Sequence, residues 1–426
     1  MPYTPHISMN FYLFCICTLL LLNYLLETSA ALLNLRALQP QPPQEFANDY
    51  STTEYARMLD YTRQRTRFAL LRDTVLLLLT LAFLLAGGFN QLDLLARSPG
   101  LDPIASGLLF TGALGLLAAL VQLPFSIYAT FGLEARFGFN TTSPQTFVFD
   151  LLKTAFLAVL LGGPLLAAIL WFFEKSGPMA WLYAWLAVSG FMLIVQFLAP
   201  TLILPLFNRF TPLNDQTLRE AISAYAQRQH FALEGIYTMD GSKRSTRANA
   251  FFTGFGRFRR IVFFDTLLNQ LSHGEILAVL AHEMGHHKLR HVPFMLVLAI
   301  AQTGFMFYLL SFFLDNEGLF AAFAMEHISV YAALIFFGFL YTPIATLLDM
   351  VVNALSRRHE YQADRFAVIS GAGVFDLISG LKRLTVKNLG TLTPHPLAVL
   401  LHYSHPPMLS RIQALRRMAT AQQKKC

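Results

Sequence analysis

The chain has 426 residues, of which 55% are apolar and only 13% are charged, and its net charge is +7. Soluble domains carry about 25% charged residues, so this composition excludes an ordinary soluble enzyme and predicts an integral membrane protein. Three cysteines are too few for a disulfide scaffold, and we expect Cys15 and Cys17, which lie in an apolar stretch, to be packing residues.

Seven apolar stretches each have close to the ~20 residues that a membrane-spanning helix needs. They cover residues 11–32, 74–92, 104–126, 154–173, 181–205, 293–314 and 328–350. No lysine or arginine precedes the first stretch, so we expect it to be a retained span and not a signal peptide. The sequence therefore predicts an all-α integral membrane fold with seven transmembrane helices.

The basic residues predict the orientation of these spans. Of the 32 lysine and arginine residues, only Arg97 and Lys175 lie in the connections that follow even-numbered spans. Because lysine and arginine accumulate on the cytoplasmic side of membrane proteins, we expect the segments 207–292 and 355–426 to face the cytoplasm. The positive net charge is then a topology signal, and we expect no nucleic-acid partner.

Four segments follow from this topology. We expect spans one to five with their loops in 1–206, a cytoplasmic segment in 207–292, spans six and seven in 293–352, and a second cytoplasmic segment in 353–426. The first cytoplasmic segment contains the strand-like stretch RRIVFF at 259–264 between helical patterns, which predicts a small β element in a mainly helical domain.

The stretch AHEMGHHKLRH at 281–291 predicts a helix that carries a metal site. Upstream, Ser272 and Glu275 have the spacing of a capping box, which marks the start of this helix. His282 and His286 are one turn apart on one face, the spacing that lets two imidazoles bind one Zn²⁺. Glu283 lies beside them and can act as a base on a water molecule at the metal.

A second pair of histidines overlaps the first. His287 and His291 are also four residues apart, but Lys288 occupies the position of the base and would repel a metal ion. The HEMGH pair is therefore the better candidate for chemistry. Solvated histidines near a membrane surface are the alternative for either pair, and the roles of His287, His291 and His359 stay open.

A catalytic zinc site has three protein ligands and one open position, so a third ligand must come from elsewhere. The acidic residues between spans six and seven would lie across the membrane from the histidines, which leaves Glu360, Asp364 and Asp376. Glu360 and Asp364 in RRHEYQADRFA share one helical face. We expect Glu360 to bind the metal and Asp364 to accept a hydrogen bond from a ligating imidazole. A charged helix face paired with neighbouring arginines is the alternative.

These motifs together resemble the CAAX prenyl protease 1 family of integral-membrane zinc endopeptidases. Besides HEMGH and ExxxD, the resemblance rests on FGLEARFGFNTTSP (131–144), LPLFNRFTPL (204–213), RSTRANAFFTGFG (244–256), IVFFDTLL (261–268) and SHPPMLSR (404–411). It implies seven tilted helices forming a ring around a chamber, with a zinc-protease domain at the cytoplasmic end. It also implies cleavage of peptide bonds near the carboxyl terminus of CAAX-type substrates, which the family takes in prenylated form.

The resemblance implies one Zn²⁺ per chain, held by His282, His286 and Glu360, with Glu283 as the catalytic glutamate. The second acidic residue of the family falls on Asp364, for which we expect an orienting role because it lies one turn beyond a ligand.

Four further residues match the family near its active site. The resemblance implies that Asn249 and Ala250 pair with the substrate backbone, that His405 stabilises the oxyanion of the reaction, and that Arg411 contacts the substrate. For Asn249 and Ala250, the alternative is an ordinary buried strand. For His405 and Arg411, the alternative is a structural turn with an ion pair.

Three other functions compete with this interpretation. A quality-control protease resembling the HtpX group would have fewer spans. A transporter with structural zinc would carry charges within its spans, which are scarce here. A catalytically silent scaffold would be expected to lack Glu283.

The partners and the location follow from the same resemblance. We expect a peptide or protein substrate, with or without a lipid, contact with membrane lipids, and a monomer as one possible state. The connection between spans six and seven is short, as in bacterial members of the family. We therefore favour a bacterial inner membrane, with the endoplasmic reticulum as the alternative and the active site on the cytoplasmic side.

Overall fold

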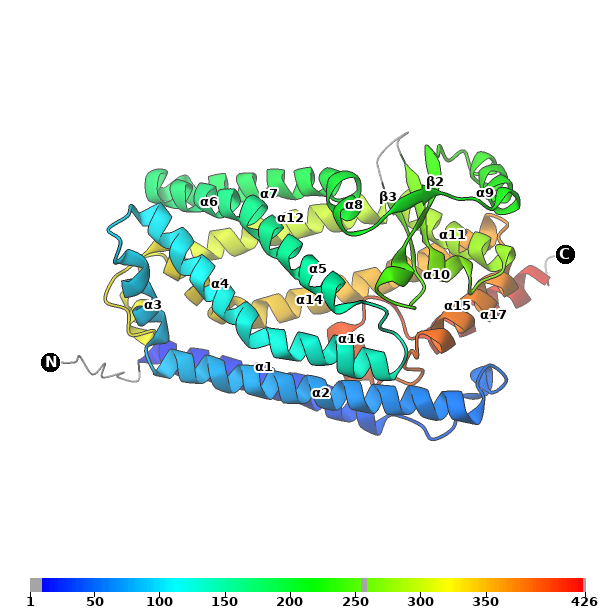
Figure 1. Cartoon of the computed structure of the whole chain (residues 1–426), viewed down its shortest axis with the longest axis horizontal. Helices are drawn as coiled ribbons and strands as arrows, with labels where there is room; N and C mark the ends of the chain where they lie inside the picture. The colour runs from blue at the N-terminus through cyan, green and yellow to red at the C-terminus, as the bar shows by residue number, and fades with distance from the viewer. Residues whose placement is uncertain (1–9, 254–258, 424–426) are drawn as a thin grey trace.

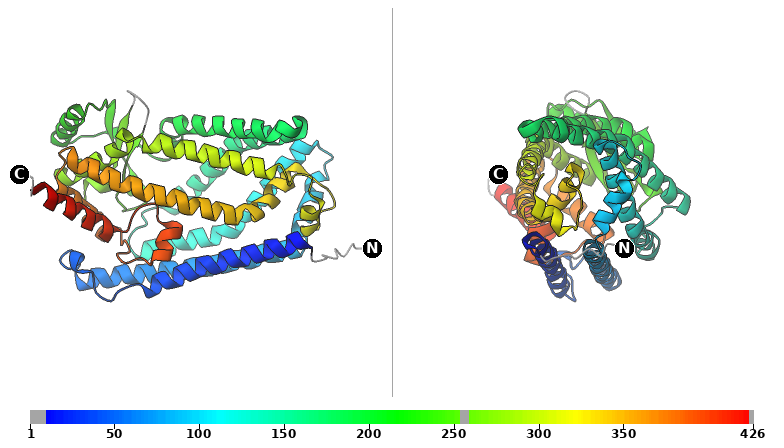
Figure 2. Two further views of the ribbon diagram at one scale, coloured as in Figure 1. Left: turned by 180° about the vertical axis from the view of Figure 1, so that it is seen from behind. Right: turned by 90° about the vertical axis from the view of Figure 1, so that its left-hand side faces the viewer.

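The computed structural model describes residues 10–253 and 259–423. The ends of the expected segments 1–206 and 353–426, and the last residues of the stretch at 244–256, lie outside this range. Long helices run along the long axis of an elongated molecule, and the sheet gathers with shorter helices at one end, on the right in Figure 1. Seen along the long axis, the helices form a ring (Figure 2, right).

Seven helical segments of the described chain are long and apolar enough to cross a membrane, which confirms the predicted number. They consist of α1 (Phe11–Arg36), α2 (Thr52–Leu85), α4 and η2 (Pro103–Ile127, Tyr128–Glu134), α5, η3 and α6 (Pro144–Leu157, Ala158–Gly162, Gly163–Lys175), η4, α7, η5 and α8 (Gly177–Met179, Ala180–Leu198, Ala199–Ile203, Leu204–Phe207), α12 (His291–Leu310) and α14 (Val330–Ile369). Large apolar side chains on these helices are exposed, as on Val159 (74%), because lipid and not protein solvates them.

The second predicted span differs from the structure at its end. The apolar stretch 74–92 is divided between α2 and a short helix α3 (Gly88–Arg97), because Gly87 adopts a left-handed conformation with φ of 69°. Glycine takes this conformation without a steric penalty. The chain therefore turns a corner inside an apolar stretch that composition alone presents as continuous.

The remaining elements lie mostly at the end of the molecule that carries the sheet. They are η1 (Gln44–Phe46), β1 (Phe210–Pro212), α9 (Gln216–Arg228), β2 (Gly235–Met239), η6 (Gly241–Lys243), β3 (Ala250–Thr253), β4 (Arg260–Phe264), α10 (Asp265–Leu268), α11 (His273–Lys288), α15 (Val374–Lys387), α16 (Pro396–His402) and α17 (Met408–Gln423), while α13 (Glu317–Ala322) lies at the opposite end with α3.

The sheet confirms the predicted β element and extends it to four strands in the order β1-β2-β4-β3. The central pair β2 and β4 is parallel, and the two outer strands are antiparallel to their neighbours. Ile261, Val262 and Phe263 of β4 are fully buried, so β4 anchors the sheet in the core. Among the described residues, β3 pairs with β4 alone, which leaves one edge of β3 without a strand.

The helix α11 begins as the sequence predicts. The Ser272 side chain accepts from the Glu275 amide, and the Glu275 carboxylate accepts from the Ser272 amide at 2.8 Å. The other oxygen of Glu275 accepts a hydrogen bond from Ser379 of α15 at 2.5 Å. Burial alone would raise the pKa of Glu275. The hydrogen bonds and the nearby charge of Arg383 outweigh burial, so the pKa lies below its ordinary value. The cap therefore also ties α11 to α15.

The helix α14 is a single element of 40 residues. The expected span 328–350 and the expected cytoplasmic helix around 357–367 are parts of this one helix, so α14 crosses the segment boundary expected at 352. The four-segment division stays a prediction. Gly371, with φ of 88°, follows the end of α14, where its left-handed conformation breaks the helix.

Candidate metal centre

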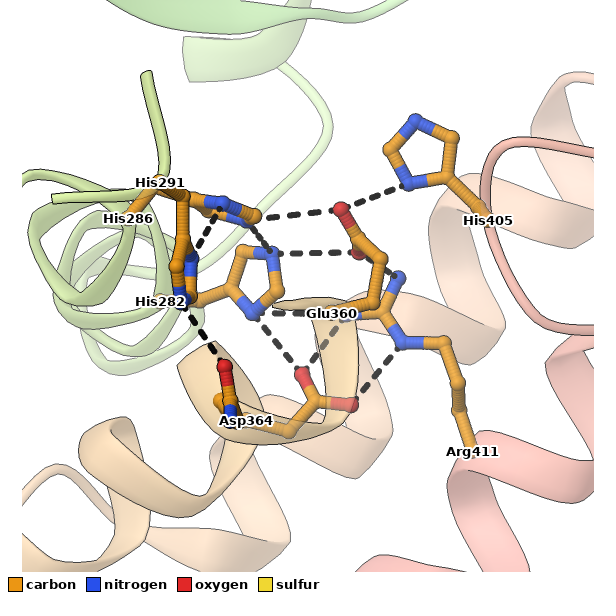
Figure 3. A network of polar contacts seen from close by, with 8 residues as sticks. His282, His286, His291, Glu360, Asp364, His405 and Arg411 are labelled. Atoms are coloured by element: carbon orange, nitrogen blue, oxygen red, sulfur yellow. Dashed lines mark hydrogen bonds and ion pairs between the residues drawn. The ribbon is translucent and has the colours of Figure 1, made fainter. Parts of the chain in front are cut away.

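Two helices bring the three predicted metal ligands together. His282 and His286 lie on α11, and their Nε2 atoms are 3.2 Å apart. Glu360 on α14 places Oε2 3.4 Å from Nε2 of His282 and Oε1 3.3 Å from Nε2 of His286. The three side chains converge on one point in Figure 3.

These separations fit a zinc ion. Ligand atoms about 2.0–2.2 Å from a tetrahedral Zn²⁺ lie roughly 3.3–3.5 Å from one another. The two Nε2 atoms are 3.2 Å apart, and each lies 3.3–3.4 Å from one of the two oxygens of Glu360. Oε2 of Glu360 is also buried and makes no hydrogen bond of good geometry to the described residues, although Nη1 of Arg411 lies 3.2 Å and Nε2 of His282 3.4 Å away. A cation between the three side chains would complete the contacts of this oxygen.

Close packing of α11 on α14 makes this convergence possible. Gly285 stands between the two histidines, and a Cβ atom at this position would lie 3.0 Å from Cα of Ala363 on α14. Glycine therefore lets the two backbones approach, and Glu360 lies one helical turn from this contact.

Asp364 lies behind His282. Its Oδ1 is 2.8 Å from Nδ1 of His282, so in the neutral ring that a metal requires Nδ1 carries the proton and the lone pair of Nε2 faces the ligand cluster. Burial lowers the pKa of His282, but the hydrogen bonds to Asp364 and Glu360 outweigh burial and raise the pKa to about 9. This position suits the orienting role expected for Asp364.

Arg411 of α17 lies deeper than expected for a residue that contacts substrate. It is only 5% exposed and donates to both oxygens of Asp364, at 2.9 and 2.6 Å. Its Nη1 is 3.2 Å from Oε2 of Glu360. The guanidinium thus offsets the charge of two buried carboxylates. Its predicted contact with substrate stays a prediction.

The other predicted residues line an open side of the centre. Glu283, Asn249, Ala250 and His405 border a cavity of about 120 Å³ together with His282 and Glu360. The His405 side chain is 66% exposed, and its Nδ1 lies 2.9 Å from Oε1 of Glu360. The structure therefore brings the candidate base, the end of the edge strand β3 and His405 to one cleft.

A larger cavity of about 730 Å³ adjoins this cleft. It lies between α1, α2 and the loop after α16, and the two cavities share Leu384 and His405 in their walls. Its volume is that of a typical ligand pocket.

Comparison with known proteins places this geometry in a family. The model of the CAAX prenyl protease N-terminal domain, with five membrane helices, matches residues 31–209, and that of peptidase family M48 matches residues 212–419. The CAAX prenyl protease 1 homolog of Arabidopsis thaliana is 34% identical over 405 residues, which cover 93% of this chain and 95% of that protein. The chain belongs to the CAAX prenyl protease 1 family.

Other members agree with this assignment. CAAX prenyl protease 1 of Saccharomyces cerevisiae is 34% identical over 403 residues, which cover 88% of each chain. The crystal structure of S. mikatae Ste24p superposes with a TM-score of 0.91 at 30% identity, over 96% of this chain and all of that chain. Membership in this family makes the chain a multi-pass membrane metalloendopeptidase.

Two residues of the centre were not assigned from the sequence. His291 opens α12, and its Nδ1 is 3.2 Å from Nδ1 of His286, while Gln362 of α14 places Oε1 3.0 Å from Nε2 of His291. No sequence pattern indicates this contact, because it depends on how α12 packs beside α14. The neighbouring His287 points elsewhere, against the rings of Phe231 and Phe252.

Proposed function

We propose that the chain is a zinc-dependent endopeptidase that hydrolyses peptide bonds near the carboxyl terminus of CAAX-type substrates, with or without a prenyl group. The observation that carries this proposal is the convergence of His282, His286 and Glu360, whose ligand atoms lie within 4.8 Å of one another, with Glu283 in the wall of the adjoining cleft. The names of the relatives supply the substrate class.

The residues of the cleft divide the reaction between them. When bound, Zn²⁺ lowers the pKa of a water molecule and polarises the scissile carbonyl. Glu283 takes a proton from the attacking water as the new C–O bond forms, and it delivers this proton to the leaving amine as the C–N bond breaks. His405, on the open side of the cleft, hydrogen-bonds the oxyanion. No covalent bond to the protein is needed.

The edge strand β3 holds the substrate in this proposal. An extended peptide can add to a free strand edge through backbone hydrogen bonds. Asn249 and Ala250 stand where β3 reaches the cleft, so a peptide paired with them would pass the candidate metal centre. The cavity of about 730 Å³ beside the cleft offers room for the rest of the substrate, including a lipid.

The location and the assembly are part of the same proposal. The bias of basic residues favours a cytoplasmic active site. The short connection between α12 and α14 favours a bacterial inner membrane, and the eukaryotic relatives keep the endoplasmic reticulum as the alternative. We expect no nucleic-acid partner, and a monomer is one possible state of the protein.

A peptide assay tests the function. The purified protein is given matched farnesylated and unmodified peptides that end in a CAAX sequence, with and without a chelator, and the products are identified by mass spectrometry. We expect cleavage near the carboxyl terminus that the chelator abolishes and added Zn²⁺ restores. Cleavage that persists in chelator, or no cleavage of either peptide by the zinc-loaded protein, would overturn the proposal.

A further inference from the structure

A second imidazole stands behind the candidate ligand His286. His291 is only 5% exposed, and its Nδ1 lies 3.2 Å from Nδ1 of His286. On its far side, Nε2 of His291 lies 3.0 Å from the amide oxygen of Gln362. Figure 3 shows His291 beside His286, on the side away from Glu360.

The chemistry of these atoms determines where the protons lie. An amide oxygen only accepts hydrogen bonds, so Nε2 of His291 carries the proton and donates it to Gln362. A neutral imidazole with a proton on Nε2 has a lone pair on Nδ1. Nδ1 of His286 must then carry the proton that lies between the two rings. The lone pair of His286 remains on Nε2, the atom that faces His282 and Glu360.

The opposite arrangement would disable the ligand. If the amide nitrogen of residue 362 donated to Nε2 of His291, the proton of His291 would move to Nδ1 and point at His286. His286 would then carry its proton on Nε2, where a metal ion needs a lone pair. The amide orientation of Gln362, which is two hydrogen bonds away from the ligand His286, therefore selects the form of His286 that can bind a metal.

We propose that His291 and Gln362 are positioning residues that hold His286 in the tautomer and ring orientation required to bind Zn²⁺. This inference rests on the proposed function, and it assigns a role to residues outside the predicted site.

The surroundings of His291 support a fixed ring. The imidazole of His359 stacks on it at 4.0 Å with an angle of 6° between the planes. Arg290, in a left-handed conformation with φ of 59°, forms the corner between α11 and α12 that turns His291 back towards His286. His291 is thus held from two sides, and its only polar contacts among the described residues are those to His286 and Gln362.

The two ligand histidines are consequently supported in different ways. His282 donates to the carboxylate of Asp364, whereas His286 donates to a neutral ring. Loss of such a supporting partner typically weakens metal binding by about 10–100-fold. We expect an effect of this size at His291 and one near the lower end of this range at Gln362.

Two pairs of variants test the proposal. His291→Phe keeps the ring and its stacking but removes the acceptor, while His291→Asn places an amide oxygen near the position of Nδ1. Gln362→Met removes the acceptor for His291, while Gln362→Glu keeps it. His287→Phe is the matched control, because it removes a neighbouring imidazole, at the end of α11, that packs against the rings of Phe231 and Phe252.

The readout is the dissociation constant of Zn²⁺ for each full-length purified protein, measured by competition with a chelating dye. The unfolding temperature of the zinc-free protein reports on the fold. We expect His291→Phe and Gln362→Met to bind Zn²⁺ about 10-fold more weakly or worse, without a matching change in the unfolding temperature. His291→Asn, Gln362→Glu and the control should remain close to the wild type.

The outcomes separate this inference from the proposed function. Failure of the wild type to bind Zn²⁺ would overturn the metal centre itself. Equal Zn²⁺ affinity of the wild type, His291→Phe and Gln362→Met would overturn the positioning role and leave the metal centre intact. If His291→Phe does not fold, the comparison of Gln362→Met with Gln362→Glu tests the positioning role by itself, because Gln362 is exposed.

Discussion

At the scale of the single residue, the buried charges of the centre depend on one another. Arg411, Asp364 and His282 form a continuous chain of charge-assisted contacts that ends at the face where the ligand atoms converge. Buried charges are stable only when they are paired. Removal of any one of these three side chains therefore leaves a buried charge without its partner. We expect substitutions at these positions to destabilise the protein.

Glu283 gives the most direct test of the chemistry. The change Glu283→Gln keeps the size of the side chain and leaves all three proposed ligands, but it removes the base. We expect the zinc content to stay at one ion per chain and kcat/KM to fall by about 10²–10⁴-fold, as measured by elemental analysis and peptide cleavage. His282→Ala is the contrasting variant, which should lose the metal. Near-normal cleavage by Glu283→Gln would refute the role of the base.

The pKa of His282 predicts how zinc binding depends on pH. In the metal-free protein this pKa is raised to about 9 from its ordinary value of 6.5, so protonation of His282 stabilises the fold below the lower value, and this stabilisation is lost as the pH rises through about 9. A metal requires the neutral ring. Zinc binding near pH 7.5 should therefore release about one more proton than binding above pH 9.

Calorimetry in buffers of different protonation enthalpy measures this proton release. Asp364→Asn removes a carboxylate that raises the pKa of His282, so this variant should release fewer protons near neutral pH. An equal number of released protons at both pH values would show that His282 is already neutral in the metal-free protein.

At the scale of the element, the contact between α11 and α14 sets the geometry of the centre. Gly285→Ala places a methyl group against the backbone of Ala363, which cannot rotate away. We expect the helices to separate, the stability to fall by about 1–3 kcal/mol, and the zinc affinity to fall as Glu360 moves away from the histidines. Thermal unfolding and zinc titration measure both effects.

Gly338→Ala is the matched control for this contact. It makes the same change on α14, where no atom of the described residues, apart from the adjoining turns of the helix itself, lies within 4 Å of the added carbon. Unchanged zinc affinity in Gly285→Ala would show that the close approach of the two backbones is not needed for the centre.

Much of this arrangement follows from patterns in the sequence, because long apolar stretches and capping residues act locally. The seven spans, the start of α11 and the strand β4 were all predictable in this way. The corner at Gly87 and the continuity of α14 were not, since apolar composition does not distinguish a straight helix from a bent one.

Prediction of the site was limited by distance along the chain. His282, His286 and Glu360 could be proposed because each belongs to a short motif with a known spacing. The contact between His291 and Gln362 joins residues 71 positions apart with no motif of their own. Only the packing of the helices brings such a pair together.

At the scale of the whole molecule, the polar domain and the corner helices α3 and α13 lie at opposite ends of the helical ring (Figure 1). Arg97 and Lys175 are the two basic residues in the connections that follow even-numbered spans. They belong to α3 and to the end of α6. Their distance from the candidate metal centre agrees with the distribution of charge that orients membrane proteins.

Labelling of single cysteines tests this orientation. Ser98→Cys lies beside α3 and Thr217→Cys lies on α9, both at exposed positions, in a background without native cysteines. In sealed inside-out vesicles, a membrane-impermeant maleimide should label Thr217→Cys and spare Ser98→Cys. Right-side-out vesicles provide the control, with the opposite pattern. The same pattern in both preparations would contradict the predicted topology.

The length of α14 has a consequence for how the enzyme senses its surroundings. Its 40 residues form a rod of about 60 Å at 1.5 Å per residue, one half apolar and the other half carrying Glu360. A bilayer thicker or thinner than the apolar half favours a different tilt of such a rod. The two histidines lie on a separate helix, so a tilt of α14 that α11 did not follow would move the carboxylate relative to them. Acyl-chain length in the host membrane would thus act as a mechanical control on metal retention, without any lipid having to occupy a binding site.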